Sequence, residues 1–329
     1  MTNLVTGANG FVGAAVVRAL AARGERVRAL VRAGSNTVNL EGLAVEIADG
    51  DLTNLQSLRA ACEGCANVFH VAADYRLWVP DPEPMYRTNV EGSVNMLKAA
   101  VAAGVGRMVY TSSVAVLGIN PDRTPADEET PVTLADMIGT YKRSKYLAEQ
   151  AVRETAVKLG FPVVTVNPST PIGPGDYRPT PTGRIIVDAA RGRMPAYVDT
   201  GLNIVHVDDV AEGHLLARDG GTPGERYILG GFDLCLKDIL VMAAALSGGK
   251  PPSVRLPRAA VYPVAVVAEV LARIGGPAPL VTRDELRMAK KHMYFSSRKA
   301  EAELGFRARP AEDAVADALA WFRAHGVIE

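Results

Sequence analysis

The sequence predicts an α/β protein with a doubly wound parallel sheet and a smaller carboxyl-terminal lobe. Strand-like and helix-like segments alternate through the first half of the chain, and such alternation requires parallel strands joined by right-handed crossovers. A glycine-rich turn follows the first strand. The 329 residues also exceed what one ordinary hydrophobic core needs, which favours an additional lobe.

The first half supplies the elements of the large sheet. Six strands are expected, at Leu4–Thr6, Val27–Val31, Ala44–Ile47, Val68–Ala72, Arg107–Thr111 and Val163–Val166. Glycines end three of the expected helices, which lie at Phe11–Arg23, Met85–Ala103 and Thr140–Leu159. A further amphipathic segment runs from Leu55 to Cys65.

The second half is less regular. Residues 168–181 are dense in proline, glycine and threonine, so we expect a loop there, at the edge where such sheets receive substrate. The other expected elements are strands at Ile204–Val207 and Arg226–Leu229 and helices at Asp208–Ala217, Leu236–Leu246, Val261–Ile274 and Ala311–His325.

Composition excludes several classes of protein. Lys and Arg number 36, as do Asp and Glu, so a nucleic-acid-binding surface is not expected. The longest nearly uncharged run, Ala259–Ala268, is shorter than the roughly 20 residues that span a bilayer. Because no leader sequence is evident, we expect a cytoplasmic protein, with peripheral membrane contact left open. Cys62 and Cys65 form a CxxC pair without two further ligands, so no metal site is expected.

The turn after the first strand predicts dinucleotide binding. Glycine at this junction permits a tight turn, close approach of a pyrophosphate and helix–strand packing, and the helix amino terminus adds free N–H groups. The expected cofactor-binding residues here are Gly7, Asn9, Gly10, Phe11, Val12 and Gly13. Residues 1–167 with about 202–220 would form this Rossmann domain, and about 168–201 with 221–329 the substrate-binding lobe.

Two residues bear on the choice of cofactor. NAD sites usually carry an acid at the end of the second strand, to bind the ribose 2′-hydroxyl, but this chain has Arg32 there. A guanidinium suits a 2′-phosphate, so we expect NADP in preference to NAD. The alternatives are that Arg32 stacks on adenine or lies in solvent. Asp51, after the third strand, is expected to meet the adenine edge unless it only closes a turn.

Ser113, Tyr141 and Lys145 form the expected catalytic centre. Tyr141 and Lys145 lie four apart at the start of a helix, so they share a face. A free tyrosine has a pKa of about 10, and a nearby ammonium with an oxidised nicotinamide should lower that pKa. Ser113 follows the fifth strand and can hydrogen-bond the reacting oxygen. A tyrosine and lysine at this spacing also occur by chance, but their order after the glycine turn favours catalysis.

These motifs resemble those of the extended short-chain dehydrogenases/reductases, over essentially the whole chain. The matching segments are Thr6–Gly13, Asp49–Leu52, His70–Ala73, Asn89–Gly92, Thr111–Ser113, Tyr141–Lys145, His206–Val210 and Lys299–Gly305. Within the family, Val27–Arg32 is similar to the dihydroflavonol-reductase-like branch, which uses NADP, and Val166–Asp176 to bacterial hopanoid-associated sugar epimerases. The resemblance implies further cofactor contacts from Leu52, Ala72, Ala73 and Pro168, besides Tyr141 and Lys145.

Departures from related families limit the chemistry. Nucleotide-sugar epimerases usually carry an arginine where Leu202-Asn203 stands, to grip the substrate diphosphate, and commonly a tyrosine where Leu117 stands. Sugar-nucleotide 4,6-dehydratases need an Asp-Glu pair where Val114-Ala115 stands. The sequence therefore disfavours a nucleotide-diphosphate substrate and excludes the dehydratase mechanism.

Other polar and aromatic residues surround the expected centre. The expected substrate-pocket residues are Tyr75, Trp78, Asn167 and Thr170. Asn89 is expected behind the site, where it fixes Tyr141 or a water, unless it only packs its helix. His70 and His206 are interpreted as structural residues, and Asp208 as a helix cap.

Hydride transfer between NADP or NAD and a secondary alcohol or ketone is the leading hypothesis. Nucleotide-sugar epimerisation with retained NAD is the alternative, and a cofactor-sensing binding protein without turnover is a minor one. The helices at 85–103 and 140–159 have faces that the sheet does not need, so a homodimer is expected. Residues 254–274 are apolar over more than one helical face. They either pack into the second lobe, or wall a pocket or touch a membrane, which would suit an apolar or lipid-linked substrate.

Overall fold

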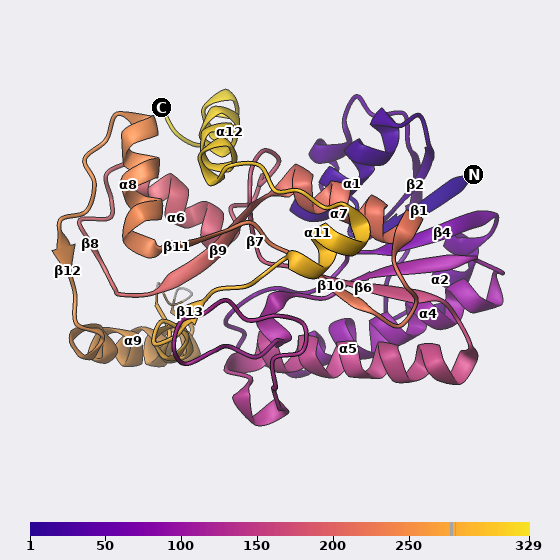
Figure 1. The fold of residues 1–329 in the computed structure, drawn as a ribbon, viewed down its shortest axis with the longest axis horizontal. Coiled ribbons are helices and arrows are strands. Elements are labelled where there is room, and N and C mark those ends of the chain that lie inside the picture. Colours follow the sequence, from indigo (N-terminus) through magenta and orange to yellow (C-terminus); the bar gives the residue numbers. More distant parts are fainter. Residues whose placement is uncertain (277–278, 280) are drawn as a thin grey trace.

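The computed structural model describes residues 1–276, 279 and 281–329. Among them, seven parallel strands form the large sheet, in the spatial order β10-β6-β5-β4-β1-β2-β3 (Figure 1). The strands are β1 (Thr2–Thr6), β2 (Arg26–Val31), β3 (Glu46–Asp49), β4 (Cys65–His70), β5 (Arg107–Thr111), β6 (Val163–Pro168) and β10 (Arg226–Leu229). The order reverses between β1 and β4, the switch point where doubly wound sheets bind cofactors. The predicted fold class is confirmed.

Helices cover both faces of the large sheet. They are α1 (Phe11–Ala22), α7 (Val207–Gly220) and α11 (Arg298–Leu304) on one face, and α2 (Leu55–Cys62), α4 (Gly92–Ala102) and α5 (Gly139–Leu159) on the other. Because both faces are covered, central strands are apolar throughout, and all six residues of β6 are buried. The helix predicted at 85–103 is interrupted: α3 (Glu83–Tyr86) and α4 are joined by a π-helical turn at Arg87–Glu91.

The second lobe is built on a small mixed sheet. Its strands are β7 (Thr170–Ile172), β9 (Gly201–His206), β11 (Phe232–Cys235) and β13 (His292–Met293), while β8 (Ala196–Tyr197) pairs with β12 (Val254–Arg255). A third apolar core lies against this sheet, between α6 (Pro181–Ala190), α8 (Leu236–Ser247) and α12 (Ala311–Ala324). Figure 1 shows α9 (Arg258–Arg273) at the end of the molecule far from β1 and β2. Within the described ranges, no helix is long and apolar enough to span a bilayer.

Two predictions about these elements are wrong. The strand at 226–229, assigned to the second lobe, is β10 at the edge of the large sheet, whereas β9, assigned to the first domain, belongs to the small sheet. Residues 168–181 are not all loop, because β7 pairs with β9. The apolar helix α9 leaves most of its large apolar side chains exposed, so packing into the second lobe accounts for only part of its apolar surface. A hydrophobic pattern indicates that a segment is extended or helical, but its packing partner is set by distant residues.

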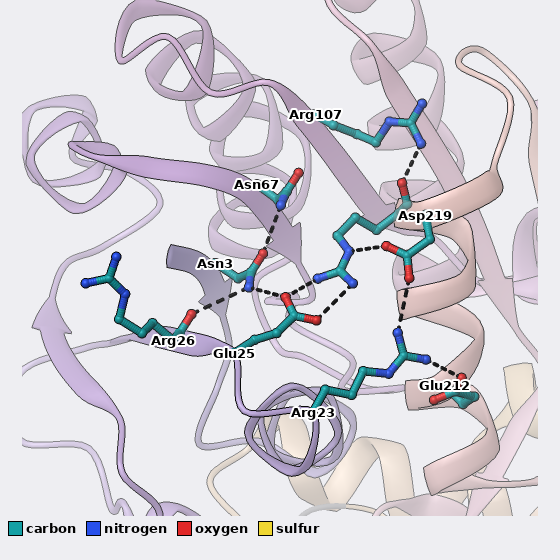
Figure 2. Close-up of polar contacts among 9 residues, drawn as sticks. Asn3, Arg23, Glu25, Arg26, Asn67, Arg107, Glu212 and Asp219 are labelled. Atoms are coloured by element: carbon teal, nitrogen blue, oxygen red, sulfur yellow. Dashed lines mark hydrogen bonds and ion pairs between the residues drawn. The ribbon is translucent and has the colours of Figure 1, made fainter. Parts of the chain in front are cut away.

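A network of charged side chains connects α1 and α7 to the amino-terminal ends of the strands in the large sheet (Figure 2). Arg218 donates to both carboxylate oxygens of Glu25, at 2.5 and 3.0 Å, and to Asp219 at 2.6 Å. Arg23 also donates to Asp219, at 3.1 Å. Burial raises the pKa of Glu25, but hydrogen bonds from Arg218 and Asn3 outweigh this and hold it below its ordinary value. The network therefore stabilises the amino-terminal ends of the strands, opposite the end that carries the glycine turn.

Candidate active site

The glycine turn closes tightly against the end of β4. Gly7 has a φ of +63°, and a Cβ atom on it would lie 2.8 Å from the Cα atom of Ala72. A Cβ atom on Gly13 would lie 2.1 Å from the carbonyl oxygen of Gly7. A Cβ atom on Gly10 would lie 3.2 Å from the same oxygen, in an extended backbone that any residue adopts. Gly7 and Gly13 are therefore required for packing, whereas Gly10 keeps the outer surface of the turn low.

The first turn of α1 fits a phosphate group. Gly10 is the N-cap, no side chain within the described residues caps the helix, and its first turn has no acid. The uncapped N–H groups of such a helix attract anions. Asn9 donates to the backbone of Asn36, and Asn39 donates to the carbonyl oxygens of Asn9 and Gly175. These bonds join the turn to the loop after β2 and to the second lobe, as the pyrophosphate of a dinucleotide would require.

A hydrogen-bonded unit fixes the ends of β1 and β4 beside this turn. Thr6 Oγ1 accepts from the backbone N–H groups of Val71 and Ala72, at 3.1 Å each, and lies 2.8 Å from Nδ1 of His70. Nε2 of His70 lies 3.0 Å from Ser93 Oγ. Burial lowers the pKa of His70 to about 3, so His70 is neutral. It is a structural residue that acts through Thr6 to hold the backbone of Val71 and Ala72 at the switch point.

The loops after β2 and β3 carry the residues predicted to bind the adenosine end. Arg32 is exposed directly after β2. Asp51 closes a turn by accepting from the N–H and hydroxyl of Thr53, at 2.8 and 2.6 Å; these bonds, with a smaller effect from Arg32, lower its pKa. Leu52 is buried and packs against Gly92: a Cβ atom on Gly92 would lie 2.7 Å from the Cβ atom of Leu52. Asp51 and Leu52, two residues of the predicted adenosine site, therefore already make contacts within the protein.

Ser113, Tyr141 and Lys145 meet where β5 ends and α5 begins. Ser113 follows β5 and accepts from the N–H of Ala115 at 3.1 Å. Its side chain also lies close enough to the hydroxyl of Tyr141 to lower the pKa of that phenol. Lys145 is buried, and its Nζ donates to the carbonyl oxygen of Thr111 at 2.8 Å. The three residues that the sequence singled out lie together at the carboxyl end of the large sheet.

The electrostatics of this centre differ from the prediction. Burial raises the pKa of Tyr141, and the nearby Ser113 hydroxyl offsets this only in part. Burial also lowers the pKa of Lys145 to about 8, against the opposing effect of Glu149. The predicted lowering of the Tyr141 pKa is therefore not produced by the protein groups alone, because desolvation outweighs them. A bound oxidised nicotinamide would add the positive charge that these groups lack.

Asn167 was predicted to line the substrate pocket. It instead lies buried behind the catalytic centre. It is fully buried, and its Nδ2 donates to the carbonyl oxygen of Ser113 and to Glu149, at 3.1 Å each. Glu149 lies one turn beyond Lys145 and pairs with Arg226 of β10 at 3.3 Å. The pairing of β10 with β6 brings Arg226 here, so sequence spacing offered no signal for Glu149 or Arg226.

Three buried polar atoms at the carboxyl ends of β5 and β6 lack hydrogen-bond partners among the described residues. They are Ser112 Oγ, Asn167 Oδ1 and Ser169 Oγ. A buried polar group without a partner costs free energy, so such groups gathered at one sheet edge point to a ligand or water. Pro168 lies between two of them, buried and paired with Leu229. These atoms fit the polar end of a nicotinamide cofactor.

Asn89 holds the backbone around Tyr141. Its Nδ2 donates to Ser144 Oγ and to the carbonyl oxygen of Asp74, at 2.9 Å each, and its Oδ1 accepts from the N–H of Asp74 at 2.7 Å. Ser144 in turn donates to the carbonyl oxygen of Tyr141 at 2.8 Å. Asn89 therefore acts on Tyr141 through Ser144 and the main chain, and it also fixes the loop after β4.

The loop after β4 faces the loop after β7. Tyr75 is 49% exposed and Trp78 is half-buried. Burial raises the pKa of Tyr75, and the nearby carboxylate of Asp176 adds to this effect. Asp176 is buried and accepts from the N–H and hydroxyl of Thr180, while burial raises its pKa to about 6. Asp176 was noted in the sequence only as part of a longer match, without a role. Thr170 is half-buried in β7.

Two further predictions concern groups outside this centre. His206, and not Asp208, caps α7, because Nδ1 of His206 accepts from the N–H of Asp208 at 3.0 Å. Asp208 instead pairs with Arg18 of α1 at 3.2 Å. Cys62 and Cys65 pack as small apolar residues in a core, where burial raises the pKa of Cys62 to about 12.

Comparison with known proteins relates this geometry to a family. Residues 3–230 match the model of the NAD dependent epimerase/dehydratase family. The chain belongs to this family. The match spans the glycine turn, the three residues Ser113, Tyr141 and Lys145, and the strands that position them. The resemblance to extended short-chain dehydrogenases/reductases is confirmed, and the protein is an NAD(P)-dependent oxidoreductase or epimerase.

Several relatives match this chain over nearly its whole length. A Synechocystis protein that carries the name of dihydroflavonol 4-reductase is 46% identical, covering 99% of this chain and 95% of its own. Sterol demethylase protein B of Methylococcus capsulatus is 38% identical and covers 100% of both chains. The crystal structure of gox2253 is 55% identical, with a TM-score of 0.90 over 100% of this chain and 99% of the other.

Proposed function

We propose that the protein is an NADP-dependent reductase of apolar ketones, with Ser113, Tyr141 and Lys145 as its catalytic residues. The observation that carries the proposal is that these three side chains lie together at the carboxyl end of β5, beside a glycine turn that fits a dinucleotide. When bound, NADPH would supply the hydride for the carbonyl carbon. Oxidation of a secondary alcohol would run the same steps in reverse.

Tyr141 is suited to donate the proton that a carbonyl oxygen needs on reduction. Because burial raises its pKa, the phenol stays protonated at neutral pH. Ser113, which lies near that hydroxyl, can donate a hydrogen bond to the same carbonyl oxygen. Lys145, with a pKa of about 8, can return a proton to Tyr141 from a position fixed by the Thr111 carbonyl.

Arg32 supports NADP over NAD as the cofactor. Its side chain is exposed at the end of β2, and its charge lowers the pKa of both Asp51 and Asp74, which supports a position near the predicted adenosine site. A planar guanidinium in that place can pair with a 2′-phosphate through two parallel hydrogen bonds. No acid stands at the end of β2 to bind a free 2′-hydroxyl.

The second lobe supports an apolar substrate over a nucleotide diphosphate. Leu202 packs against the third apolar core. The polar atoms of Asn203 are used internally: Nδ2 donates to Asp233 at 2.7 Å and to the carbonyl oxygen of Phe295 at 3.1 Å, and Oδ1 accepts from the N–H of Gly231 at 2.8 Å. Neither residue is free to grip a diphosphate. The names of the two relatives refer to dihydroflavonols and sterols, which are ring compounds without a diphosphate group.

The same family resemblance leads us to propose a homodimer through α4 and α5. Val157 and Leu159, near the end of α5, are 82% and 45% exposed. Pairing α4 and α5 with their copies about a two-fold axis gives a four-helix interface, which can cover such side chains. Light scattering should give twice the mass of one chain at micromolar concentration, and the mass of a single chain would contradict the proposal.

Substitution of Tyr141 by phenylalanine tests the proposed chemistry. Tyr141→Phe keeps the ring packing and removes the proton donor, so ketone-dependent oxidation of NADPH should fall by about 10²–10⁴. Dihydroflavonols and 3-ketosteroids are the probes. Tyr146→Phe removes a hydroxyl from the next turn of α5 and should leave the rate nearly unchanged. Turnover by Tyr141→Phe close to that of the wild type would show that another group carries the proton.

A further inference from the structure

Helix α9 exposes its apolar face to solvent and turns polar side chains toward the protein, unlike an ordinary surface helix. Its outward face carries Val264, Val267, Val270, Leu271 and Ile274, each between 49% and 77% exposed. Of the seventeen exposed large apolar side chains among the described residues, eight lie at 254–274. By helical spacing this outward face has no charged residue. An apolar face of this extent on a single element marks an interaction surface.

The inward face of α9 is held by polar contacts. Glu269 is buried and accepts from the N–H and Nε of Arg283, at 2.6 and 2.8 Å. Arg258 donates to the carbonyl oxygens of Asp199 and Ala289, at 3.1 and 3.0 Å. The charged side chains that an ordinary surface helix turns to water are used here to attach the helix to the second lobe. The attachment therefore fixes the apolar face outward.

The segment around α9 is strongly basic. Residues 250–291 contain eight Lys or Arg and three Asp or Glu, a net charge of +5 in a chain of net charge zero. The three acids are engaged within the protein: Glu269 with Arg283, Asp284 with Arg287, and Glu285 in the capping box of α10 (Arg283–Met288). The exposed lysines of the segment are Lys250, Lys290 and Lys291. An exposed apolar helical face in a segment of net positive charge fits an anionic lipid surface.

This surface adjoins the catalytic helix. α10 packs against α9, and a Cβ atom on Gly139, the first residue of α5, would lie 3.3 Å from the carboxylate of Asp284. A cavity of about 70 Å³ lies between the start of α5 and α10. Apolar side chains, among them Leu117, Met288 and Met293, line it together with the charged Asp136, Lys142 and Lys291. A lipid surface at α9 would therefore lie beside the end of α5 that carries Tyr141.

We propose that α9 binds the headgroup region of an anionic membrane, with its apolar face inserted toward the acyl chains and the neighbouring lysines on the lipid phosphates. The binding does not depend on the proposed reaction, so it is tested without turnover. Its use, delivery of an apolar ketone to the site from the membrane, rests on the proposed function.

Vesicle flotation measures this binding directly. Wild-type protein should float with phosphatidylcholine vesicles that contain phosphatidylglycerol, less so in high salt, and weakly with phosphatidylcholine alone. The double variant Val267→Asp, Leu271→Asp should lower the partition coefficient about tenfold or more, because two apolar side chains no longer insert. The matched control is Val241→Asp, Leu246→Asp on α8, where the side chains are also exposed, and it should bind as the wild type does. Equal loss in both variants would overturn the assignment to α9.

A tryptophan probe provides a second measurement that does not depend on lost binding. Val267→Trp adds a third tryptophan to the two of the natural chain, and its emission should shift to the blue, and be quenched by brominated lipids, only with anionic vesicles. The absence of both flotation and the shift would overturn the proposal. A self-associated form that Val267→Asp, Leu271→Asp dissociates, without vesicle binding, would assign the face to a second copy of the chain instead.

Discussion

Addition of one methyl group at Gly13 should destabilise the fold before any ligand is involved. The new Cβ atom would lie 2.1 Å from the carbonyl oxygen of Gly7 and 2.7 Å from its carbonyl carbon. Both are main-chain atoms, so no flexible side chain can move aside. Relief requires the turn to open, and Gly7 is already held at a φ of +63° against Ala72.

The expected magnitudes separate packing from ligand binding. Overpacking costs about 1–3 kcal/mol, and alanine recovers about 1 kcal/mol of helix propensity, because Gly13 lies in α1. Since the contact is far inside van der Waals distance, we expect a cost beyond that range and a net loss of about 2 kcal/mol or more. Gly10→Ala should lower the free energy of unfolding by only about 1 kcal/mol, because its Cβ contact of 3.2 Å needs a small shift and alanine is a poorer N-cap than glycine. Its methyl group would instead face the pyrophosphate.

Two assays resolve these effects. Urea unfolding without cofactor should rank Gly13→Ala well below Gly10→Ala, and NADPH titration should show weakened binding by both. Gly24→Ala is a control for backbone strain alone, because Gly24 has a φ of +70° with nothing within 4 Å of its Cβ position; it should cost about 1 kcal/mol and leave binding intact. Wild-type stability of Gly13→Ala would refute the packing argument. Wild-type NADPH affinity of Gly10→Ala would refute the placement of the pyrophosphate.

Three other predictions test the cofactor, the sheet edge and the substrate. Arg32→Asp should weaken NADP binding far more than NAD binding, with Arg26→Asp at the start of β2 as the control; an unchanged ratio of affinities would show that Arg32 does not contact the 2′-phosphate. Arg218→Leu should lower the free energy of unfolding by about 2 kcal/mol near pH 7, because Glu25 loses its partner, whereas Arg26→Leu should have little effect. Since the folded-state pKa of Glu25 is lowered, its contribution is present above the ordinary carboxyl pKa and is lost as pH falls through the folded-state value, so the difference between Arg218→Leu and wild type should shrink in acid. A pH-independent difference would contradict this account. In thermal-shift titrations with NADPH, dihydroflavonols should stabilise the protein more than UDP-glucose; saturable binding of UDP-glucose alone would instead favour nucleotide-sugar epimerisation.

Local patterns in the sequence were sufficient to predict six of the seven strands of the large sheet and the two ends of the expected site. Alternating strands and helices leave few ways to form a parallel sheet, and the spacing of Gly7, Gly10 and Gly13 suits one kind of turn. Tyr141 and Lys145 share a face because an α-helix repeats every 3.6 residues. Each of these inferences depends on neighbours within one or two turns of the chain, so a single sequence contains the information.

Contacts between distant segments were decided only by the tertiary structure. Asn167 reaches Ser113 because β6 pairs with β5, and Arg226 reaches Glu149 because β10 pairs with β6. The pKa of Tyr141 rises because burial outweighs the nearby polar groups, and the extent of burial is set by all the surrounding elements. The sequence shows that α9 is apolar, but not which of its faces the second lobe covers. Periodicity groups residues on a face, whereas the surroundings of that face come from residues far along the chain.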